Sequence, residues 1–327
     1  MITRLEISGL FDLYSYDLRF EDDAINIITG PNGYGKTTIL RIINSLYTKD
    51  FVSLMNLRFK KLIYHFDGKV LSVKQTIDSI EEGDSSDLPT ENKVSLDFQF
   101  YSESDGYAQP DAFTLTSDEK ELTDSVTSGG FELFMNSRQC FFISDDRLVS
   151  KKTDTINSSL PIASDLLSMD IGIFKSLLCK YGFGDEEKQK LHPEFYSKVE
   201  VFKSIIANSY FADKTMQISL MYGIRFQSHN PLKEFIDIQK LSSGEKHILI
   251  QTLELLFIAK DGMVAMVDEP ELSFHPAWLN QYIPNIEKIQ KVKALEGKRF
   301  QVILATHSPS LIGQRWDKCI DLYENRL

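Results

Sequence analysis

Residues 30–37 of this 327-residue chain read GPNGYGKT and match the phosphate-binding pattern G-x-x-x-x-G-K-[ST]. The three glycines let the backbone curl without Cβ clashes, so that consecutive N–H groups point at a phosphate. Lys36 is expected to reach the β- and γ-phosphates, and the Thr37 hydroxyl is expected to bind Mg²⁺. The segment predicts a P-loop for a nucleoside triphosphate. Its candidate binding residues are Gly30, Asn32, Gly33, Gly35, Lys36, Thr37 and Thr38.

An acidic pair at positions 268 and 269 is the second candidate for chemistry. It follows the apolar run 263–267 (MVAMV), which is typical of a buried parallel strand. Asp268 is predicted to complete the Mg²⁺ shell, usually through water, and Glu269 to orient and polarise the attacking water. Two carboxylates that only solvate a sheet edge are the alternative. The P-loop earlier in the chain favours the catalytic interpretation.

A histidine follows a third apolar run. Residues 300–305 (FQVILA) predict another parallel strand, and Thr306 and His307 come directly after it. The carboxyl ends of parallel strands form the ligand edge of an α/β sheet. This pattern places His307 on the same edge as the P-loop and makes it a candidate site residue.

Two serines and a glycine open a further predicted helix. Ser242, Ser243 and Gly244 precede an apolar-rich stretch that predicts a helix through Ala259. Ser242 or Ser243 is a natural N-cap, and a helix that begins with Ser and Gly offers another anion site. Taken alone, this segment would be ordinary helix capping.

In their order along the chain, these four motifs resemble those of the ABC ATPases. The stretch LSSGE at residues 241–245 is similar to the LSGGQ-type signature, whose helix in one subunit meets the γ-phosphate held by the P-loop of the other. The resemblance implies ATP and Mg²⁺ as cofactors, nucleotide contacts from Ser243 and Gly244, and a γ-phosphate contact from His307. It also implies a head-to-tail homodimer with two composite ATP sites.

A narrower resemblance is carried by EPELSFHP at residues 269–276. It looks like the E-P-E-x-x-x-H-P sequence of OLD-type and related prokaryotic ATPases, which are relatives of the SMC and RecF proteins, whereas transporter ATPases show an S-A-L-D type sequence. Two features depart from the family pattern. Residues 144–147 (SDDR) stand where the family has its glutamine loop, and they contain no glutamine. Gln99 and Gln139 are the candidates for that residue, and neither follows the expected strand. The chain also stops at Leu327, where an OLD nuclease would continue into a metal-dependent TOPRIM domain.

The motif order predicts an α/β fold of the P-loop NTPase class, an ABC ATPase head in a single domain of residues 1–327. Its core sheet is expected to be parallel or mixed. Residues 1–147 should hold the P-loop and an antiparallel β lobe with acidic loops at 78–130. Residues 148–215 should form a helical insertion, and residues 216–327 should hold the signature, the acidic pair and the histidine.

Period-2 patterns predict strands at residues 2–8 and 16–20. A hairpin that turns at Asp67-Gly68 is predicted within 60–77, and further strands are predicted at 92–101, 216–220 and 223–226, with polar loops at 81–90 and 102–130. The continuous apolar run 140–143 predicts a buried strand. Phe11, Tyr14 and Tyr16 lie where a ring could stack on adenine. Half-buried strand aromatics are the more common explanation.

The net charge of −11 argues at first against a polyanion partner. Residues 78–124, however, contain 14 acidic and two basic residues, a net −12, so the remaining chain carries +1. The net charge therefore does not exclude a nucleic-acid-binding surface outside residues 78–124. Basic residues on solvated helix faces are the alternative explanation of the basic clusters. The basic clusters are Arg58, Lys60 and Lys61; Arg147, Lys151 and Lys152; and Lys288, Lys291, Lys293, Lys298 and Arg299.

Cysteine spacing and apolar runs suggest the compartment. Cys140, Cys179 and Cys319 lack C-x-x-C spacing and are predicted to be core residues of a protein in the reducing cytoplasm. The N-terminus reads as a strand rather than a signal peptide, and no apolar run approaches the ~18 residues needed to span a bilayer. We expect no membrane segment.

The favoured function is an ATP-operated homodimer, a slow regulatory ATPase that controls a separate effector such as a toxin or nuclease in antiphage defence or DNA maintenance. A RecF-like DNA-repair clamp is the alternative. The nucleotide-binding subunit of a membrane transporter is less favoured, because such a compact subunit would not need the acidic segment 78–124.

Overall fold

The computed structural model describes residues 1–22, 24–79, 92–102, 111–117, 129–135, 138–143, 163–211 and 213–327. At its centre lies a five-stranded sheet of order β14-β3-β13-β12-β8, in which every pairing is parallel. The strands are β3 (Ile25–Thr29), β8 (Cys140–Ile143), β12 (Met263–Asp268), β13 (Phe300–Ala305) and β14 (Cys319–Asp321). The α/β fold with a parallel core that the sequence predicts is confirmed.

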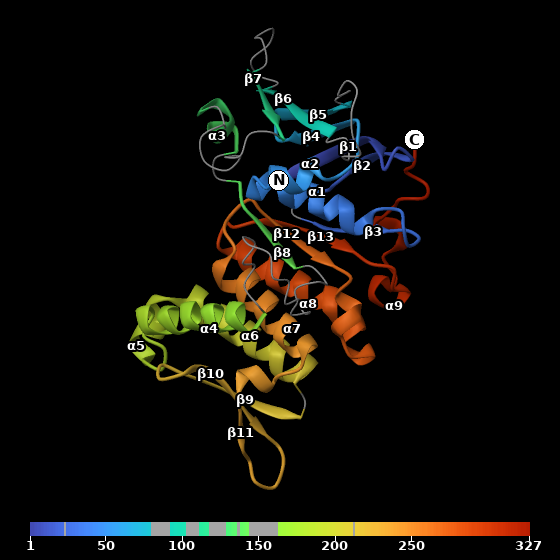
Figure 1. Cartoon of the computed structure of the whole chain (residues 1–327). Coiled ribbons are helices and arrows are strands. Elements are labelled where there is room, and N and C mark those ends of the chain that lie inside the picture. Colours follow the sequence, from blue (N-terminus) through green and yellow to red (C-terminus); the bar gives the residue numbers. More distant parts are fainter. Residues whose placement is uncertain are drawn as a thin grey trace, which may run out of the picture.

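Both faces of the central sheet are buried, which explains why its strands read as continuous apolar runs. On one face, alternate residues such as Ile28, Met266 and Ile303 pack with helix α1 (Lys36–Thr48) and the β lobe. On the other face, residues such as Ile27 and Val267 pack with α7 (Ser243–Leu253) and α8 (Pro276–Leu295). Figure 1 shows α1 above the sheet and α7 and α8 below it.

A six-stranded antiparallel sheet of order β2-β1-β4-β5-β6-β7 forms the predicted β lobe (Figure 1). Its strands are β1 (Ile2–Leu10), β2 (Tyr14–Arg19), β4 (Lys61–Phe66), β5 (Lys69–Ser79), β6 (Asn92–Ser102) and β7 (Asp111–Thr116), and the short helices α2 (Phe51–Met55) and α3 (Gly129–Met135) accompany it. The hairpin turn at Asp67-Gly68 is confirmed, with Gly68 at φ 63°.

The polar loop predicted at 102–130 is wrong in part. β7 lies within it and pairs with β6, and α3 begins at Gly129. The reason is a pair of apolar residues in a polar stretch. The Phe113 ring stacks on Phe98 with centroids 4.5 Å apart, and Leu115 is buried. Residues 81–90, the other predicted loop, lie outside the described residues.

The helical lobe lies beyond α7. It consists of α4 (Ala163–Lys180), α5 (Glu186–Leu191) and α6 (Pro193–Ile205), with π-helical turns η3 (Ile206–Tyr210) and η5 (Glu254–Ile258) continuing α6 and α7. Its aromatic and aliphatic side chains join the core of the central sheet's lower face. The first part of the predicted helical region, residues 148–162, is outside the described part of the chain.

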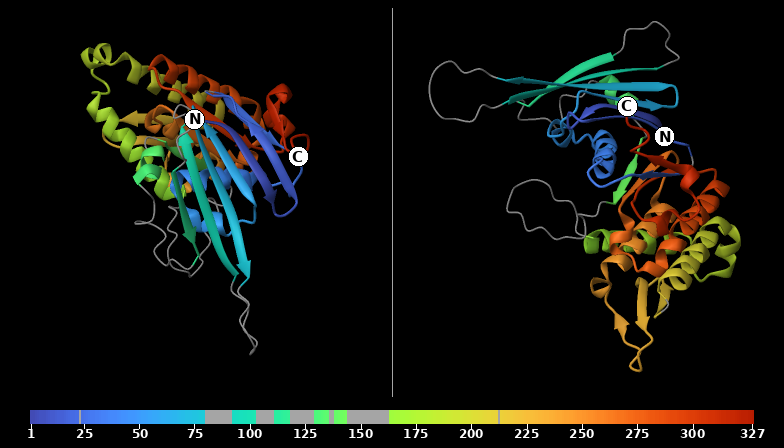
Figure 2. Two further views of the ribbon diagram at one scale, coloured as in Figure 1. Left: turned by 90° about the horizontal axis from the view of Figure 1, so that it is seen from above. Right: turned by 90° about the vertical axis from the view of Figure 1, so that its right-hand side faces the viewer.

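A small antiparallel sheet of order β11-β10-β9 projects from the helical lobe, at the opposite end of the molecule from the β lobe (Figure 2). It contains β9 (Lys214–Ser219), β10 (Gly223–Ser228) and β11 (Phe235–Ile236). The predicted strands at 216–220 and 223–226 are confirmed, and β11 is an addition. The chain then passes through η4 (Ile238–Lys240) into α7, so the sheet leads directly to the signature segment.

Two predictions about single side chains are wrong. Cys179 is exposed, whereas Cys140 and Cys319 are half-buried, so the three thiols are not uniformly core residues. Lys293 does not belong to a basic surface: it is 1% exposed, and its Nζ donates to Ala259 O at 2.6 Å. Burial lowers the pKa of Lys293 to about 8. In the described part of the chain, no helix is both long and apolar enough to cross a membrane.

Candidate functional site

Strand register gathers three of the four motifs at one edge of the central sheet. Ile28 of β3 pairs with Ala305 of β13, and Ala305 pairs with Asp268 of β12. The residues that follow these strands are the P-loop, Glu269 and Thr306. Because the strands are parallel, their carboxyl ends meet at the edge where α/β folds bind ligands.

The P-loop has the backbone that its glycines predict. Gly30, Gly33 and Gly35 have φ values of 146°, 86° and 90°, which favour glycine. A Cβ on Gly30 would lie 3.2 Å from Leu322 Cβ, whereas a Cβ on Gly33 would meet nothing within 4 Å. Asn32 and Gly33 are exposed. The loop is therefore supported on one side and open on the other, which fits the approach of a phosphate group.

Lys36 folds back over this loop. Its side chain is 6% exposed, and Nζ donates to Gly30 O at 3.0 Å and to Pro31 O at 3.5 Å. The same nitrogen lies 3.7 Å from Glu269 Oε1. The lysine of the P-loop and the second carboxylate of the acidic pair are thus ion-paired. Thr37 and Thr38, on the first turn of α1, are half-buried.

Glu269 is held in an unusual backbone conformation. Its φ and ψ are 42° and 54°, a left-handed geometry that costs a non-glycine residue on the order of 1–3 kcal/mol. The Glu269 N–H donates to Ala305 O at 2.9 Å, which fixes this residue to the end of β13. Pro270 follows and begins the 3₁₀ turn η6 (Pro270–Ser273). Strain of this kind gathers at functional sites, where it sets the direction of a side chain.

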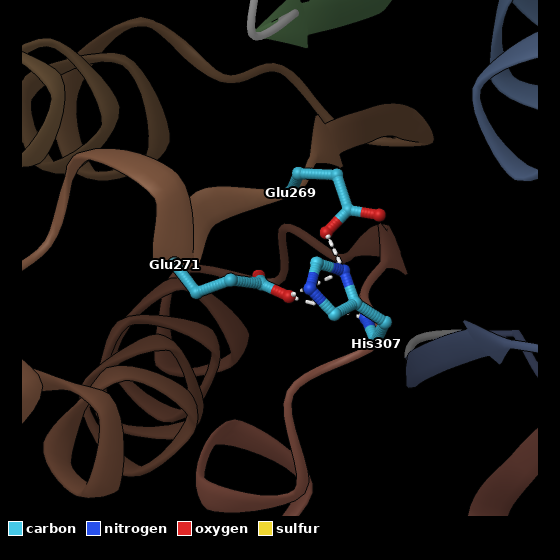
Figure 3. A group of neighbouring side chains, drawn as sticks. All are labelled: Glu269, Glu271 and His307. Atoms are coloured by element: carbon cyan, nitrogen blue, oxygen red, sulfur yellow. Dashed lines mark hydrogen bonds and ion pairs between the residues drawn. The ribbon is translucent and has the colours of Figure 1, made fainter. Parts of the chain in front are cut away.

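The Glu269 carboxylate joins a compact cluster with His307 and Glu271 (Figure 3). His307 Nδ1 lies 2.5 Å from Glu269 Oε2 and 3.5 Å from Glu271 Oε1. Burial is the main cause that raises the pKa of Glu269 to about 7, and the hydrogen bond and charge of Glu271 act in the same direction. His307 and Lys36 oppose this rise. A carboxylate with a pKa near neutrality suits a group that must accept a proton.

Glu271 is the member of this cluster whose role sequence reasoning missed. Its Oε1 accepts from Thr306 Oγ1 at 2.5 Å and from the His307 N–H at 3.1 Å. The second glutamate of the sequence EPE was the available signal, but the sequence alone does not show that it reaches the segment after β13. One atom from each of Glu269, Glu271 and His307 lies within 4.8 Å of the others, a set that could also hold a divalent transition metal.

The residues predicted to hold Mg²⁺ have suitable chemistry. Asp268 ends β12 and is 1% exposed, and Thr37 lies next to Lys36 at the start of α1. A carboxylate and a hydroxyl are the oxygen donors that Mg²⁺ prefers when it also binds phosphates. The donor set fits this ion, and the assignment of Asp268 and Thr37 stays a prediction.

The signature segment lies on the other face of the central sheet from α1. Ser242 is the N-cap of α7 and forms a capping box with Glu245, whose Oε2 accepts from Ser242 N at 2.8 Å and from Ser242 Oγ at 2.9 Å. Lys214 Nζ lies 2.6 Å from Glu245 Oε1. Ser243 is exposed and Gly244 is buried in the first turn. Of the two serines left open by the sequence, Ser242 is the cap, which leaves Ser243 free to contact a ligand.

The aromatic residues near the P-loop differ in access. Tyr16 is fully buried, and its hydroxyl donates to Tyr34 O at 2.8 Å, so it cannot stack on a base. The Tyr14 ring stacks on Tyr34 with centroids 5.3 Å apart. Phe11 is 39% exposed, and its ring lies 3.8 Å from the place of a Cβ on Gly35. Phe11 is the most exposed of the three residues, and its contact with adenine stays a prediction.

Neither candidate for the glutamine loop lies at this edge. Gln139 precedes β8 and is therefore at the amino end of the parallel sheet. Gln99 lies within β6, where it pairs with Ser72 and Ala112 of the β lobe. Residues 144–147, which follow β8, are outside the described residues.

The chain is similar in sequence to a known family and to a named protein, and it aligns with a solved structure. Residues 141–313 match the family described as "AAA domain, putative AbiEii toxin, Type IV TA system". The chain is 28% identical to the Septu protein PtuA of Bacillus thuringiensis. The alignment extends over 335 residues and covers 95% of this chain and 73% of that protein. The chain also aligns with a solved structure from Pyrococcus furiosus, the Smc head domain with an extended coiled coil bound to the C-terminal domain of ScpA. The alignment covers 98% of this chain and 92% of the chain in that structure. The TM-score is 0.42 and the identity 12%.

The family match spans more than half of the chain and includes the signature helix, the acidic pair and His307, while the P-loop lies before it. The P-loop completes the set at the edge of the same parallel sheet. The fold is that of a P-loop NTPase, and the chain belongs to this family of AAA-domain ATPases.

Proposed function

We propose that this chain is an ATP-binding and hydrolysing switch, which pairs head to tail with a second copy around two ATP molecules and controls a separate effector protein. The observation that carries this proposal is the continuous set of contacts from Lys36 through Glu269 to His307. It joins the P-loop lysine to a carboxylate with a raised pKa and to a half-exposed imidazole.

The P-loop residues bind the phosphates. The backbone N–H groups around Gly33 and Gly35, together with the start of α1, supply positive potential. Lys36 exchanges its carboxylate partner Glu269 for the phosphate oxygens, which keeps its buried charge paired in both arrangements. When Mg²⁺ is bound by Asp268 and Thr37, it neutralises charge that develops on the phosphates.

Glu269 then orients and deprotonates the attacking water. Once Lys36 has turned to the phosphates, one of the groups that lowers the pKa of Glu269 is gone, so the carboxylate becomes a better base. His307 contacts Glu269 Oε2 and is 48% exposed. This exposure leaves its second ring nitrogen available for a γ-phosphate oxygen.

The second half of each ATP site comes from the partner copy in this proposal. Ser243 and Gly244 begin α7 on the opposite face of the sheet from α1, which favours a contact between copies over one within a copy. The γ-phosphate would hold the two copies together, and its loss would release them. This difference in contacts between nucleotide states is what a switch requires.

The biological role is proposed from the narrower resemblance. EPELSFHP resembles the OLD-type ATPases, and this favours antiphage defence or DNA maintenance. The family description names a toxin–antitoxin system, which fits a pairing of the ATPase with an effector protein. We assign residues 1–147 and 216–327 to the ATPase body, and residues 148–215 to a helical insertion that faces the effector protein.

A concentration series tests the proposal. ATP hydrolysis by the purified chain, measured with Mg²⁺ at increasing protein concentration, should rise more steeply than linearly at low concentration, because two copies form each site. Size measured with ATP should be that of a dimer. Hydrolysis that is linear in protein concentration together with a monomeric size would overturn the composite site. DNA binding titrated with salt separates a RecF-like clamp from the effector switch, since phosphate contacts weaken as salt rises.

A further inference from the structure

Glu271 connects the turn after β12 to the segment after β13. It lies on η6, and its side chain is 8% exposed. Oε1 receives two hydrogen bonds from consecutive residues of the other segment, from Thr306 Oγ1 at 2.5 Å and from the His307 N–H at 3.1 Å. One oxygen thus holds both the side chain that precedes His307 and the backbone of His307 itself.

The contacts continue beyond Thr306. Its Oγ1 also accepts from the Ser308 N–H at 3.0 Å, so a single chain of hydrogen bonds runs from Ser308 to Glu271. Thr306 is fully buried, whereas the His307 side chain is 48% exposed. An imidazole with this much solvent around it is not held by packing. Its position depends on its contact with Glu269 and on the backbone from which it projects, and Glu271 fixes that backbone.

We propose that Glu271 is a positioning residue for His307. It sets the turn at Thr306 and His307 so that Nδ1 meets Glu269 while the rest of the ring faces the phosphates. This inference rests on the proposed ATPase function. It assigns no contact with the nucleotide to Glu271, and it predicts that the main effect of Glu271 on hydrolysis passes through His307.

Two substitutions of Glu271 test the hydrogen bonds themselves: one keeps an oxygen that can accept them, and the other replaces it with an apolar side chain. In Glu271→Gln, the amide oxygen can take the place of Oε1 and keep both hydrogen bonds. The amide nitrogen then replaces Oε2, a buried oxygen that receives no hydrogen bond within the described residues. In Glu271→Leu the oxygen that accepts both hydrogen bonds is lost. Leu272→Ala is the matched control, because Leu272 lies on the same turn and is 64% exposed.

Steady-state kinetics are the first measurement. Glu271→Leu should lower kcat about tenfold or more, as expected for a displaced catalytic group, while KM for ATP stays within about twofold. Glu271→Gln should recover most of kcat, and Leu272→Ala should match the wild type. If Glu271→Leu does not fold, Thr306→Val removes one of the two hydrogen bonds from the other side and should lower kcat in the same direction.

A double-mutant cycle shows whether the effect passes through His307. In a His307→Ala background, adding Glu271→Leu should cause a much smaller further loss of kcat, because only the direct effect of Glu271 on Glu269 remains. A further loss of the same size as in the wild-type background would overturn the proposal, and so would a Glu271→Leu variant with wild-type kcat.

An NMR measurement keeps this test separate from the proposed function. The side-chain resonances of His307 should shift in Glu271→Leu and stay in place in Leu272→Ala. Absence of ATP hydrolysis in the wild type would overturn the ATPase proposal, and the His307 resonances would still decide whether Glu271 positions the imidazole. Unchanged resonances in Glu271→Leu would contradict the positioning role.

Discussion

Lys36 Nζ lies 3.7 Å from Glu269 Oε1, and both side chains are almost buried, with 6% and 11% of their surfaces exposed. The pair joins the loop after β3 to the residue after β12, across the intervening strand β13. A buried cation needs a partner at all times, because an unpaired charge in this environment is costly. Glu269 is the anionic partner of Lys36 in the structure, and in the proposed function the phosphates of ATP replace it as that partner.

Lys36→Ala should abolish ATP binding or reduce it strongly, because the β- and γ-phosphates lose their main cationic contact. We expect a loss of affinity of at least about a hundredfold by calorimetry, with hydrolysis at background. Lys291→Ala is the control, since Lys291 is exposed on α8, far along the chain from the P-loop. Wild-type hydrolysis by Lys36→Ala would remove the P-loop from the mechanism.

Glu269→Gln should bind ATP and fail to hydrolyse it. The amide preserves the size of the side chain but cannot accept the proton of the attacking water. The variant should therefore accumulate as an ATP-bound dimer, which light scattering after gel filtration would detect. If turnover is unchanged, Glu269 is not the base, and His307 becomes the leading candidate.

Lys214→Met should lower kcat severalfold while ATP binding stays unchanged. Lys214 pairs with Glu245 Oε1 at 2.6 Å, and Glu245 in turn holds the N-cap Ser242. Loss of the lysine leaves a carboxylate that is 9% exposed without its cation and loosens the first turn of α7. The control is Lys240→Met, an exposed lysine of η4. Equal kcat in the two variants would argue against a role for this ion pair in the signature segment.

Asp170→Asn should make stability less dependent on pH. Asp170 lies on α4 and is 3% exposed; burial, followed by the charge and hydrogen bond of Glu254, raises its pKa from 3.8 to about 8. Between these values the folded protein holds a proton that the unfolded chain releases, so the free energy of unfolding falls as pH rises. Asparagine is neutral throughout this window and removes that loss.

Melting temperatures from about pH 5 to about pH 9 test this prediction. The Tm of the wild type should fall across the range, and that of Asp170→Asn should fall less. Asp317→Asn, which changes an exposed carboxylate, should follow the wild type. Parallel curves for all three proteins would show that Asp170 does not carry the raised pKa.

Much of the site could be predicted from local sequence. The P-loop glycines, the acidic pair and His307 each follow an apolar strand, and parallel pairing brings such strand ends together. A short motif defines its own backbone, as the φ values of Gly30, Gly33 and Gly35 show.

Contacts between distant segments could not be predicted. Glu271 reaches Thr306, and Lys214 reaches Glu245, through side chains whose partners depend on how whole elements pack. The strand β7 was hidden because only Phe113 and Leu115 mark it within a polar stretch. Lys293 reads as a surface charge by composition, yet its helix turns it towards Ala259 O. In each case tertiary packing, rather than residue type, decides the outcome.

In the proposed dimer, each ATP site combines the P-loop of one copy with the signature of the other. Ser243→Arg should place bulk and charge at the γ-phosphate contact, so that hydrolysis is lost while a single copy still binds ATP. Lys36→Ala disables the P-loop instead. A mixed dimer of the two variants contains one site with both defects and one site with neither.

Mixing the two purified, inactive variants in equal amounts is the most direct measurement. We expect hydrolysis to reappear on mixing, up to a substantial fraction of the wild-type rate, and we expect neither variant to gain activity when it is mixed with more of itself. A mixture that stays as inactive as its components, although the wild type is active, would contradict the shared site and place the whole reaction within one copy.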